Sequence, residues 1–132
     1  MSSPLFHMIA GGPRPVAPFS HATEIDGWVF VTGQMPTDPL APDAPLPDGI
    51  ATQTDRVMDN LKIVLAGVGL SLAHVLQARV YLTQFERDYA GMNTAYRKYF
   101  EAGKLPARTC IGVTALAVGA LVEIDLVAKR PE

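Results

Sequence analysis

Three side chains that could do chemistry, Arg108, Cys110 and Glu123, lie in two strand-like segments near the end of the chain. Arginine offers a planar, permanently charged fork that grips a carboxylate with two hydrogen bonds, and glutamate can hold a water molecule and transfer its proton. Apolar residues alternate with other residues over 108–115 and 121–128, which is typical of strands. The alternation predicts that these side chains share one sheet face. Burying an unpaired charge is costly, so each charge there needs a partner or a ligand.

The segments that must position these residues predict a mixed α and β domain. In chain order we expect an arm over about 1–18, strands over 20–25 and 28–32, a loop over 36–48 and a helix over 49–67. A strand over 75–85, a helix over 88–103, and strands over 108–115 and 121–128 should follow. Asp26-Gly27 is a two-residue hairpin signal between the first two strands. Asp48 is the predicted N-cap of the first helix, and Gly103 is the predicted C-cap of the second.

The order β-β-α-β-α-β-β predicts one α+β domain over residues 1–132, a sandwich whose helices cover one face of a sheet. The opposite face would carry charged residues, among them Glu123 and Asp125, together with the apolar Val75 and Tyr81. Such a face cannot simply be exposed to solvent, and identical copies of the chain could close it. We therefore expect a ring-shaped homo-oligomer with its sites at the subunit junctions.

Composition excludes several classes of protein. With 48% hydrophobic and 18% charged residues the chain is not intrinsically disordered, and no apolar run approaches the length of a membrane span. The formal charge of -2 and the scattered lysines and arginines lack the basic footprint of a nucleic-acid binder. One cysteine allows no internal disulfide, and the separated histidines offer no metal-ligand spacing. We expect a cytoplasmic protein with no metal, no nucleic-acid partner and no membrane contact.

Eight short pieces of the chain, taken in order and at their spacing, resemble the reactive intermediate deaminase family (Rid, or YjgF). They lie between Pro15 and Ala128 and are Ala17-Pro18-Phe19-Ser20, Val31-Thr32-Gly33-Gln34, Asp38-Pro39, Gln53-Thr54, Asn60-Leu61-Lys62, Asn93 with Tyr96 and Phe100, Pro106-Ala107-Arg108-Thr109-Cys110, and Gly119-Ala120-Leu121-Val122-Glu123-Ile124. The resemblance implies a chorismate-mutase-like α+β fold and a homotrimeric barrel with three clefts between subunits. It also implies cofactor-free hydrolysis of 2-imino acids or enamines to 2-keto acids and ammonia.

The same resemblance assigns roles to individual positions. Arg108 corresponds to the arginine that binds the substrate carboxylate, and Glu123 to the glutamate that positions water. The implied substrate-binding positions are Phe19, Thr32, Gly33, Asn93 and Cys110. Phe19 stands where the family usually has a tyrosine, so a hydrogen-bond donor is lost from the cleft and the substrate preference is open.

The spacing of the last two strands suggests where the sites lie. If these strands form a simple hairpin turning near Val118, Arg108 lies several residues along the sheet from Glu123 of its own chain, beyond hydrogen-bond reach. Our hypothesis is that each site pairs Arg108 from one subunit with Glu123 from its neighbour.

Other functions and simpler roles remain open. Phe19 leaves room for an enamine specialist, such as a 2-aminomuconate deaminase. A non-catalytic trimer that binds small carboxylates would keep Arg108 but tolerate loss of Glu123, whereas the endoribonuclease label often given to the family is disfavoured by the missing basic patch. Arg108 could instead form a salt bridge with Glu123 or Asp125, and Cys110 could be a small buried hydrophobe.

Overall fold

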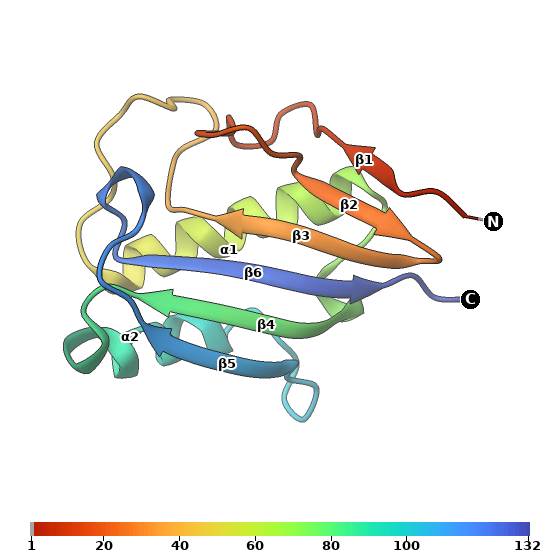
Figure 1. Cartoon of the computed structure of the whole chain (residues 1–132). Coiled ribbons are helices and arrows are strands. Elements are labelled where there is room, and N and C mark those ends of the chain that lie inside the picture. The colour runs from red at the N-terminus through yellow and green to blue at the C-terminus, as the bar shows by residue number, and fades with distance from the viewer. Residues whose placement is uncertain (1) are drawn as a thin grey trace.

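The computed structural model describes residues 2–132 and places two helices on one face of a six-stranded sheet (Figure 1). The strands are β1 Leu5–His7, β2 Ala22–Ile25, β3 Trp28–Gln34, β4 Val75–Leu82, β5 Ala107–Gly112 and β6 Val122–Lys129. The helices are α1 Ile50–Gly67 and α2 Phe85–Arg97, with short 3-10 turns at Leu72–His74 and Ala117–Gly119. The predicted α+β class and element order are confirmed, with β1 as an additional strand. Neither helix is long and apolar enough to cross a membrane, within the part of the chain that the structure describes.

The N-terminal arm is more ordered than predicted. Its residues Leu5–His7 pair antiparallel with β2, so the expectation of an irregular arm over 1–18 is wrong at this point. The buried His21 ring fastens the rest of the arm, since it accepts from the Ile9 N–H at Nδ1 (2.8 Å) and donates from Nε2 to the Pro13 carbonyl (2.6 Å). A buried side chain with both ring nitrogens bonded therefore helps to hold the arm, together with the packing of Ile9 against the core.

The turns and helix ends are confirmed in part. Asp26 and Gly27 have φ of 52° and 81° and join β2 to β3, as the hairpin signal predicted. The N-cap of α1 is Gly49 rather than Asp48, and no side chain caps the helix. The helix α2 ends at Arg97, so Gly103 is not its C-cap. Gly103 lies in a separate turn with φ of 79°, closed by a bond from the Lys104 N–H to the Glu101 carbonyl.

The strand order in the sheet is β1-β2-β3-β6-β4-β5, so the expected hairpin of the last two strands is wrong. Strand β4 lies between them, antiparallel to β6 and parallel to β5. Parallel neighbours need a crossover connection, and α2 supplies it between β4 and β5. This arrangement puts β5 at the edge of the sheet, where its outer side is unpaired.

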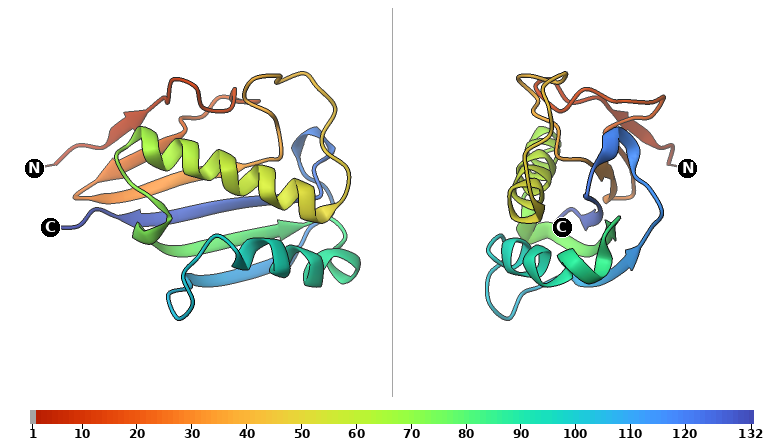
Figure 2. Two further views of the ribbon diagram at one scale, coloured as in Figure 1. Left: turned by 180° about the vertical axis from the view of Figure 1, so that it is seen from behind. Right: turned by 90° about the vertical axis from the view of Figure 1, so that its left-hand side faces the viewer.

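The core lies between the helices and one sheet face, and Figure 2 shows both helices on that same side. In β6 the apolar residues Val122, Ile124, Leu126 and Ala128 are buried in it, and the intervening residues project to the opposite face. No helix covers that opposite face, which we call the open face.

The prediction that Arg108, Cys110 and Glu123 share a face is wrong. Arg108 is in register with Ala78, which is in register with Leu126, and all three therefore point toward the helices. Cys110 is likewise in register with the buried Val80. The expectation assumed that the apolar side of β5, which includes Ile111, faces the core. In this edge strand Ile111 instead lies on the open face and is 47% exposed.

Candidate functional site

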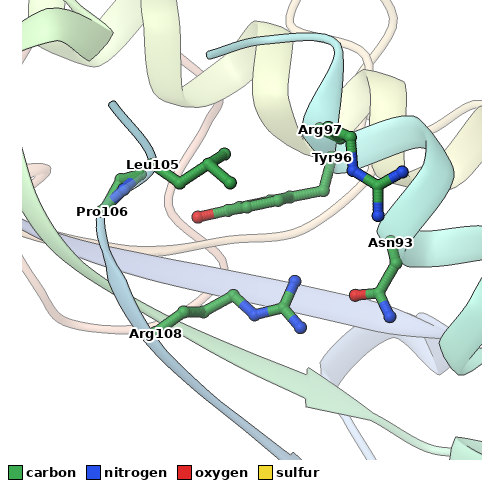
Figure 3. A pocket seen from close by; sticks show the side chains of 6 residues that line it. All are labelled: Asn93, Tyr96, Arg97, Leu105, Pro106 and Arg108. Atoms are coloured by element: carbon green, nitrogen blue, oxygen red, sulfur yellow. The ribbon is translucent and has the colours of Figure 1, made fainter. Parts of the chain in front are cut away.

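A cavity of about 250 Å³ opens beside Arg108, between α2 and the segment that leads into β5 (Figure 3). Its lining side chains are Asn93, Tyr96 and Arg97 from α2, and Leu105, Pro106 and Arg108 from the following loop and strand. We call this cavity the arginine pocket. It brings together two predicted site residues, Arg108 and Asn93, that lie on different elements.

Aromatic rings orient the Arg108 guanidinium in this pocket. Its Cζ lies 5.0 Å from the ring centroid of Tyr96 and 5.9 Å from that of Tyr89, within the range of a cation–π contact. Its only polar contacts are long ones, 3.5 Å to the Tyr89 hydroxyl and 3.8 Å to the Met92 sulfur. No carboxylate of residues 2–132 forms an ion pair with it. The salt bridges considered for Arg108 are therefore absent, and its fork can accept an anion.

Two further polar atoms in the pocket lack partners. The Tyr96 side chain is only 4% exposed, yet its hydroxyl makes no hydrogen bond, and the buried Asn93 Oδ1 makes none either. Buried polar atoms are normally paired, so these two are unsatisfied groups in the lining of the pocket among residues 2–132. Burial raises the pKa of Tyr96, against a smaller lowering by the Arg108 charge, so the phenol stays protonated and can donate.

Tyr96 is a site residue that the sequence resemblance quoted without assigning it a role. Its spacing along α2 is typical of a core position, and its ring does pack in the core beside Phe100. The sequence feature that could have identified Tyr96 as a pocket residue is its position three residues after Asn93, which places both side chains on one side of the helix.

Cys110 lies on the helix side of β5 but does not line the arginine pocket. It is half-buried and packs against the core. Burial raises the pKa of the thiol, and the Arg108 charge only partly opposes this. A thiol held protonated is a poor nucleophile, which favours the packing role over a chemical one.

Glu123 lies on the open face, beside Gly33. It forms no ion pair with residues 2–132, so the suggested salt bridge to Arg108 is absent at this end as well. Burial, and then the negative charge of Asp125, raise the pKa of the Glu123 carboxyl. A carboxyl with a raised pKa can both accept and return a proton nearer neutral pH, as proton transfer in catalysis requires.

Thr32 and Gly33 lie on the same open face, where the pairing of β3 with β6 is interrupted between Val31 and Gln34. They line a second hollow, of about 190 Å³, with Arg79 and Asp125 among the other residues. The Thr32 hydroxyl donates to the Ser20 carbonyl at 2.6 Å. The half-buried Phe19 immediately precedes Ser20, so it belongs to this end of β3 and does not line the arginine pocket.

Asp125 is occupied within the chain. Arg79 donates to its two oxygens at 2.8 and 3.0 Å, and the Tyr81 hydroxyl donates to it at 3.0 Å. A carboxylate with three donors orders the open face and is not available to Arg108. Arg79 is thereby unavailable as a salt-bridge partner for Glu123.

The predicted site residues thus form two groups on opposite faces of one sheet. Arg108, Asn93 and Cys110 lie on the helix side, and Glu123, Gly33 and Thr32 lie on the open face. Within a single chain the sheet therefore separates Arg108 from Glu123. Among residues 2–132, no three histidine, cysteine or acidic side chains converge in a way that could hold a metal ion.

Comparisons with known proteins agree with this fold. A family model described as Endoribonuclease L-PSP matches residues 10–130. Protein DfrA of Myxococcus xanthus is 41% identical over 118 residues, 88% of this chain and 88% of its own length. The Rid-family protein YyfA of Yersinia pestis has a TM-score of 0.90 at 28% identity, covering 97% of this chain and 100% of its own. E. coli TdcF, solved with bound serine, has a TM-score of 0.85 at 25% identity, covering 94% of this chain and 98% of its own.

Proposed function

This chain belongs to the family described as Endoribonuclease L-PSP, which includes the Rid proteins, and from that premise we propose that it is a cofactor-free hydrolytic deaminase. Its substrates are reactive 2-imino acids or their enamine tautomers, and its products are 2-keto acids and ammonia. One observation carries the proposal: the Arg108 guanidinium lies in a cavity without a carboxylate partner among residues 2–132, with its Cζ 5.0 Å from the ring centroid of the buried Tyr96.

The arginine pocket suits the acid end of such a substrate. A 2-imino acid carries a carboxylate next to a C=N bond, and a bidentate contact with Arg108 would fix the orientation of the imine carbon. The Tyr96 hydroxyl can donate to the same carboxylate, and the Asn93 oxygen can accept from the imine N–H. The ligand would thereby satisfy the polar atoms that the chain leaves unpaired.

A second copy of the chain would complete the site. Because Glu123 and Arg108 of one chain lie on opposite faces of its sheet, we propose that the Glu123 serving each arginine pocket comes from a neighbouring subunit. The open face also exposes Trp28, Phe30 and Ile111 by 42 to 47%, which is a surface that another subunit would cover. We therefore propose a homotrimer with its sites at the subunit junctions. The separation of Arg108 and Glu123 by the sheet supports it, in place of the hairpin spacing.

The reaction needs one water molecule and one proton relay. Glu123 takes a proton from water as the water oxygen attacks the imine carbon, and it returns this proton to the nitrogen as the C=N bond becomes single. Glu123 then transfers the hydroxyl proton of the tetrahedral intermediate to the same nitrogen, so that the carbon–nitrogen bond breaks, ammonia leaves, and the carbon–oxygen bond becomes a carbonyl. Small imines already hydrolyse in water, so positioning by Arg108 and the relay through Glu123 are sufficient.

The test generates imines in situ with an amino-acid oxidase and traps them with semicarbazide, using several amino acids. Wild-type protein should accelerate the loss of the trappable imine, and Arg108→Ala should abolish the acceleration while folding normally. If no imine disappears faster with the wild-type protein, this function is wrong.

A second candidate is a non-catalytic trimer that binds small carboxylates, which the serine bound to TdcF favours. It requires Arg108 but no proton transfer. The variant Glu123→Ala separates the two, since a binding protein would keep all its activity and the deaminase would lose turnover while still binding carboxylates.

A further inference from the structure

The arginine pocket contains two guanidinium groups and no acid. Arg97, in the last turn of α2, lines it opposite the strand that carries Arg108, and Figure 3 shows both side chains around the opening with Asn93. None of the six lining residues is acidic. Neither arginine forms an ion pair within residues 2–132.

The lack of an ion-pair partner distinguishes these two arginines from the other arginines of the chain. Four of them contact carboxylates, in the pairs Arg14–Asp43, Arg79–Asp125, Arg87–Asp88 and Arg130–Glu24. A fifth, Arg56, donates to the Asn60 side-chain oxygen at 3.2 Å. The two arginines that contact neither a carboxylate nor an amide oxygen both line this one cavity.

The placement of Arg97 distinguishes it from its neighbour Lys98. Arg97 follows Asn93 by four residues, so the two side chains lie on the same side of α2. Lys98 points elsewhere and pairs with Asp55 of α1 at 3.2 Å. Both cations lie at the helix C-terminus, where a positive charge is favourable, but that interaction does not use the hydrogen-bonding fork of arginine.

We infer that the substrate of this site is a dicarboxylate: a 2-imino diacid or the corresponding enamine. This inference rests on the proposed function. Two cations at one cavity repel each other unless the bound molecule supplies negative charge, and a single carboxylate satisfies one fork. Arg108 binds the carboxylate next to the C=N bond, and Arg97 binds the second one.

The first experiment measures binding without turnover. Isothermal titration compares succinate with butyrate, and glutarate with pentanoate, on the wild-type protein, Arg97→Gln and Lys98→Gln. The wild type should bind each diacid about tenfold more tightly than its monoacid, the effect of one charge-assisted contact. Arg97→Gln should remove this preference, with a much larger loss of affinity for the diacids than for the monoacids. Lys98→Gln, which loses the same charge at the next position, should keep it.

The second experiment measures kcat/KM for imines generated from aspartate and glutamate against those generated from alanine and leucine. Arg97→Gln should lower kcat/KM for the diacid imines about tenfold, mainly through KM, and spare the others. Equal affinities for diacids and monoacids, or a preference that survives Arg97→Gln, would overturn the inference while leaving the deaminase intact. Selective diacid binding without any imine hydrolysis would instead keep the diacid site and refute the proposed reaction.

Discussion

Gly33 lies so close to Glu123 that a Cβ added at position 33 would overlap the Oε2 atom of the carboxyl group. The two residues come from β3 and β6, which are paired in the sheet, and the missing side chain at position 33 leaves the space that the carboxyl group occupies. A glycine on the open face is therefore part of what positions the Glu123 carboxyl group.

Replacing this glycine should impair turnover through Glu123. In Gly33→Ala the new methyl group displaces the carboxyl group, so kcat should fall about a hundredfold, the contribution typical of general acid–base catalysis, with KM little changed. Steady-state kinetics of imine hydrolysis measures both. Combining Gly33→Ala with Glu123→Gln should cost no more than Glu123→Gln alone, and additive losses would show that the glycine acts independently.

Mixed oligomers test whether sites are shared between subunits. In the proposed trimer, Arg108→Ala and Glu123→Ala chains should each be inactive alone, but every mixed trimer would contain one junction with both residues intact. Unfolding and refolding the two variants together in equal amounts should therefore restore about a quarter of the wild-type activity. Refolding each variant separately is the control. An inactive mixture that still contains mixed trimers would place Arg108 and Glu123 in different functions.

The pH dependence of the rate should report on Glu123. Burial raises its pKa, so the rate should rise with pH through an apparent pKa above the ordinary value for glutamate. The sign for stability is the reverse: the folded chain binds this proton more tightly than the unfolded chain, so stability falls as pH rises from the ordinary pKa through the raised one. Glu123→Gln should remove this fall in chemical denaturation curves measured from pH 4 upward. If the unfolding free energy of Glu123→Gln depended on pH as that of the wild type does, Glu123 would not be the group with the raised pKa.

Glu24 should affect the pH dependence of the unfolding free energy in the direction opposite to Glu123. Arg130 donates to its two oxygens at 2.5 and 2.9 Å, and together with His7 it lowers the pKa of Glu24 to about 2. The stabilisation is present above the unfolded-state pKa and is lost as pH falls toward 2. Glu24→Gln should therefore lower the unfolding free energy at pH 7 by about 2 kcal/mol and flatten its acid limb. Denaturation at several pH values measures both, and equal stability of variant and wild type at pH 7 would contradict the ion pair.

Tyr96→Phe separates ligand binding from stability. Its hydroxyl has no partner in the chain, so removing it should leave the melting temperature unchanged or slightly higher, and the ring keeps its contact with Arg108. Affinity for a small carboxylate should fall about fivefold, because the bound ligand loses a donor. Tyr99→Phe is the matched control: its hydroxyl donates to the Asp55 carboxylate at 3.1 Å, so it should lower stability and spare binding. Unchanged affinity in Tyr96→Phe would exclude the phenol from the site.

The local elements could be predicted from sequence because short-range physics decides them. The Asp26-Gly27 turn requires two residues that tolerate positive φ, and the sequence supplies a suitable pair. In β6 the alternation of Val122 and Ile124 with Glu123 is a property of one strand, so the glutamate was correctly separated from the core side chains. The prediction of helix caps was weaker, since Gly49 ends the preceding loop without any side-chain signal.

Only the tertiary structure decided that Arg108 and Glu123 lie on opposite sides of the sheet. Alternation fixes which residues of a strand share a face, but the phase between two strands depends on their partners and register, and a shift by one residue exchanges the faces. Here β4 lies between β5 and β6 and aligns Arg108 with Ala78 and Leu126, which are buried under the helices. Long-range pairing therefore determined that the predicted site residues lie in two groups on opposite faces of the sheet, whereas the sequence by itself determined the chemical groups on each face.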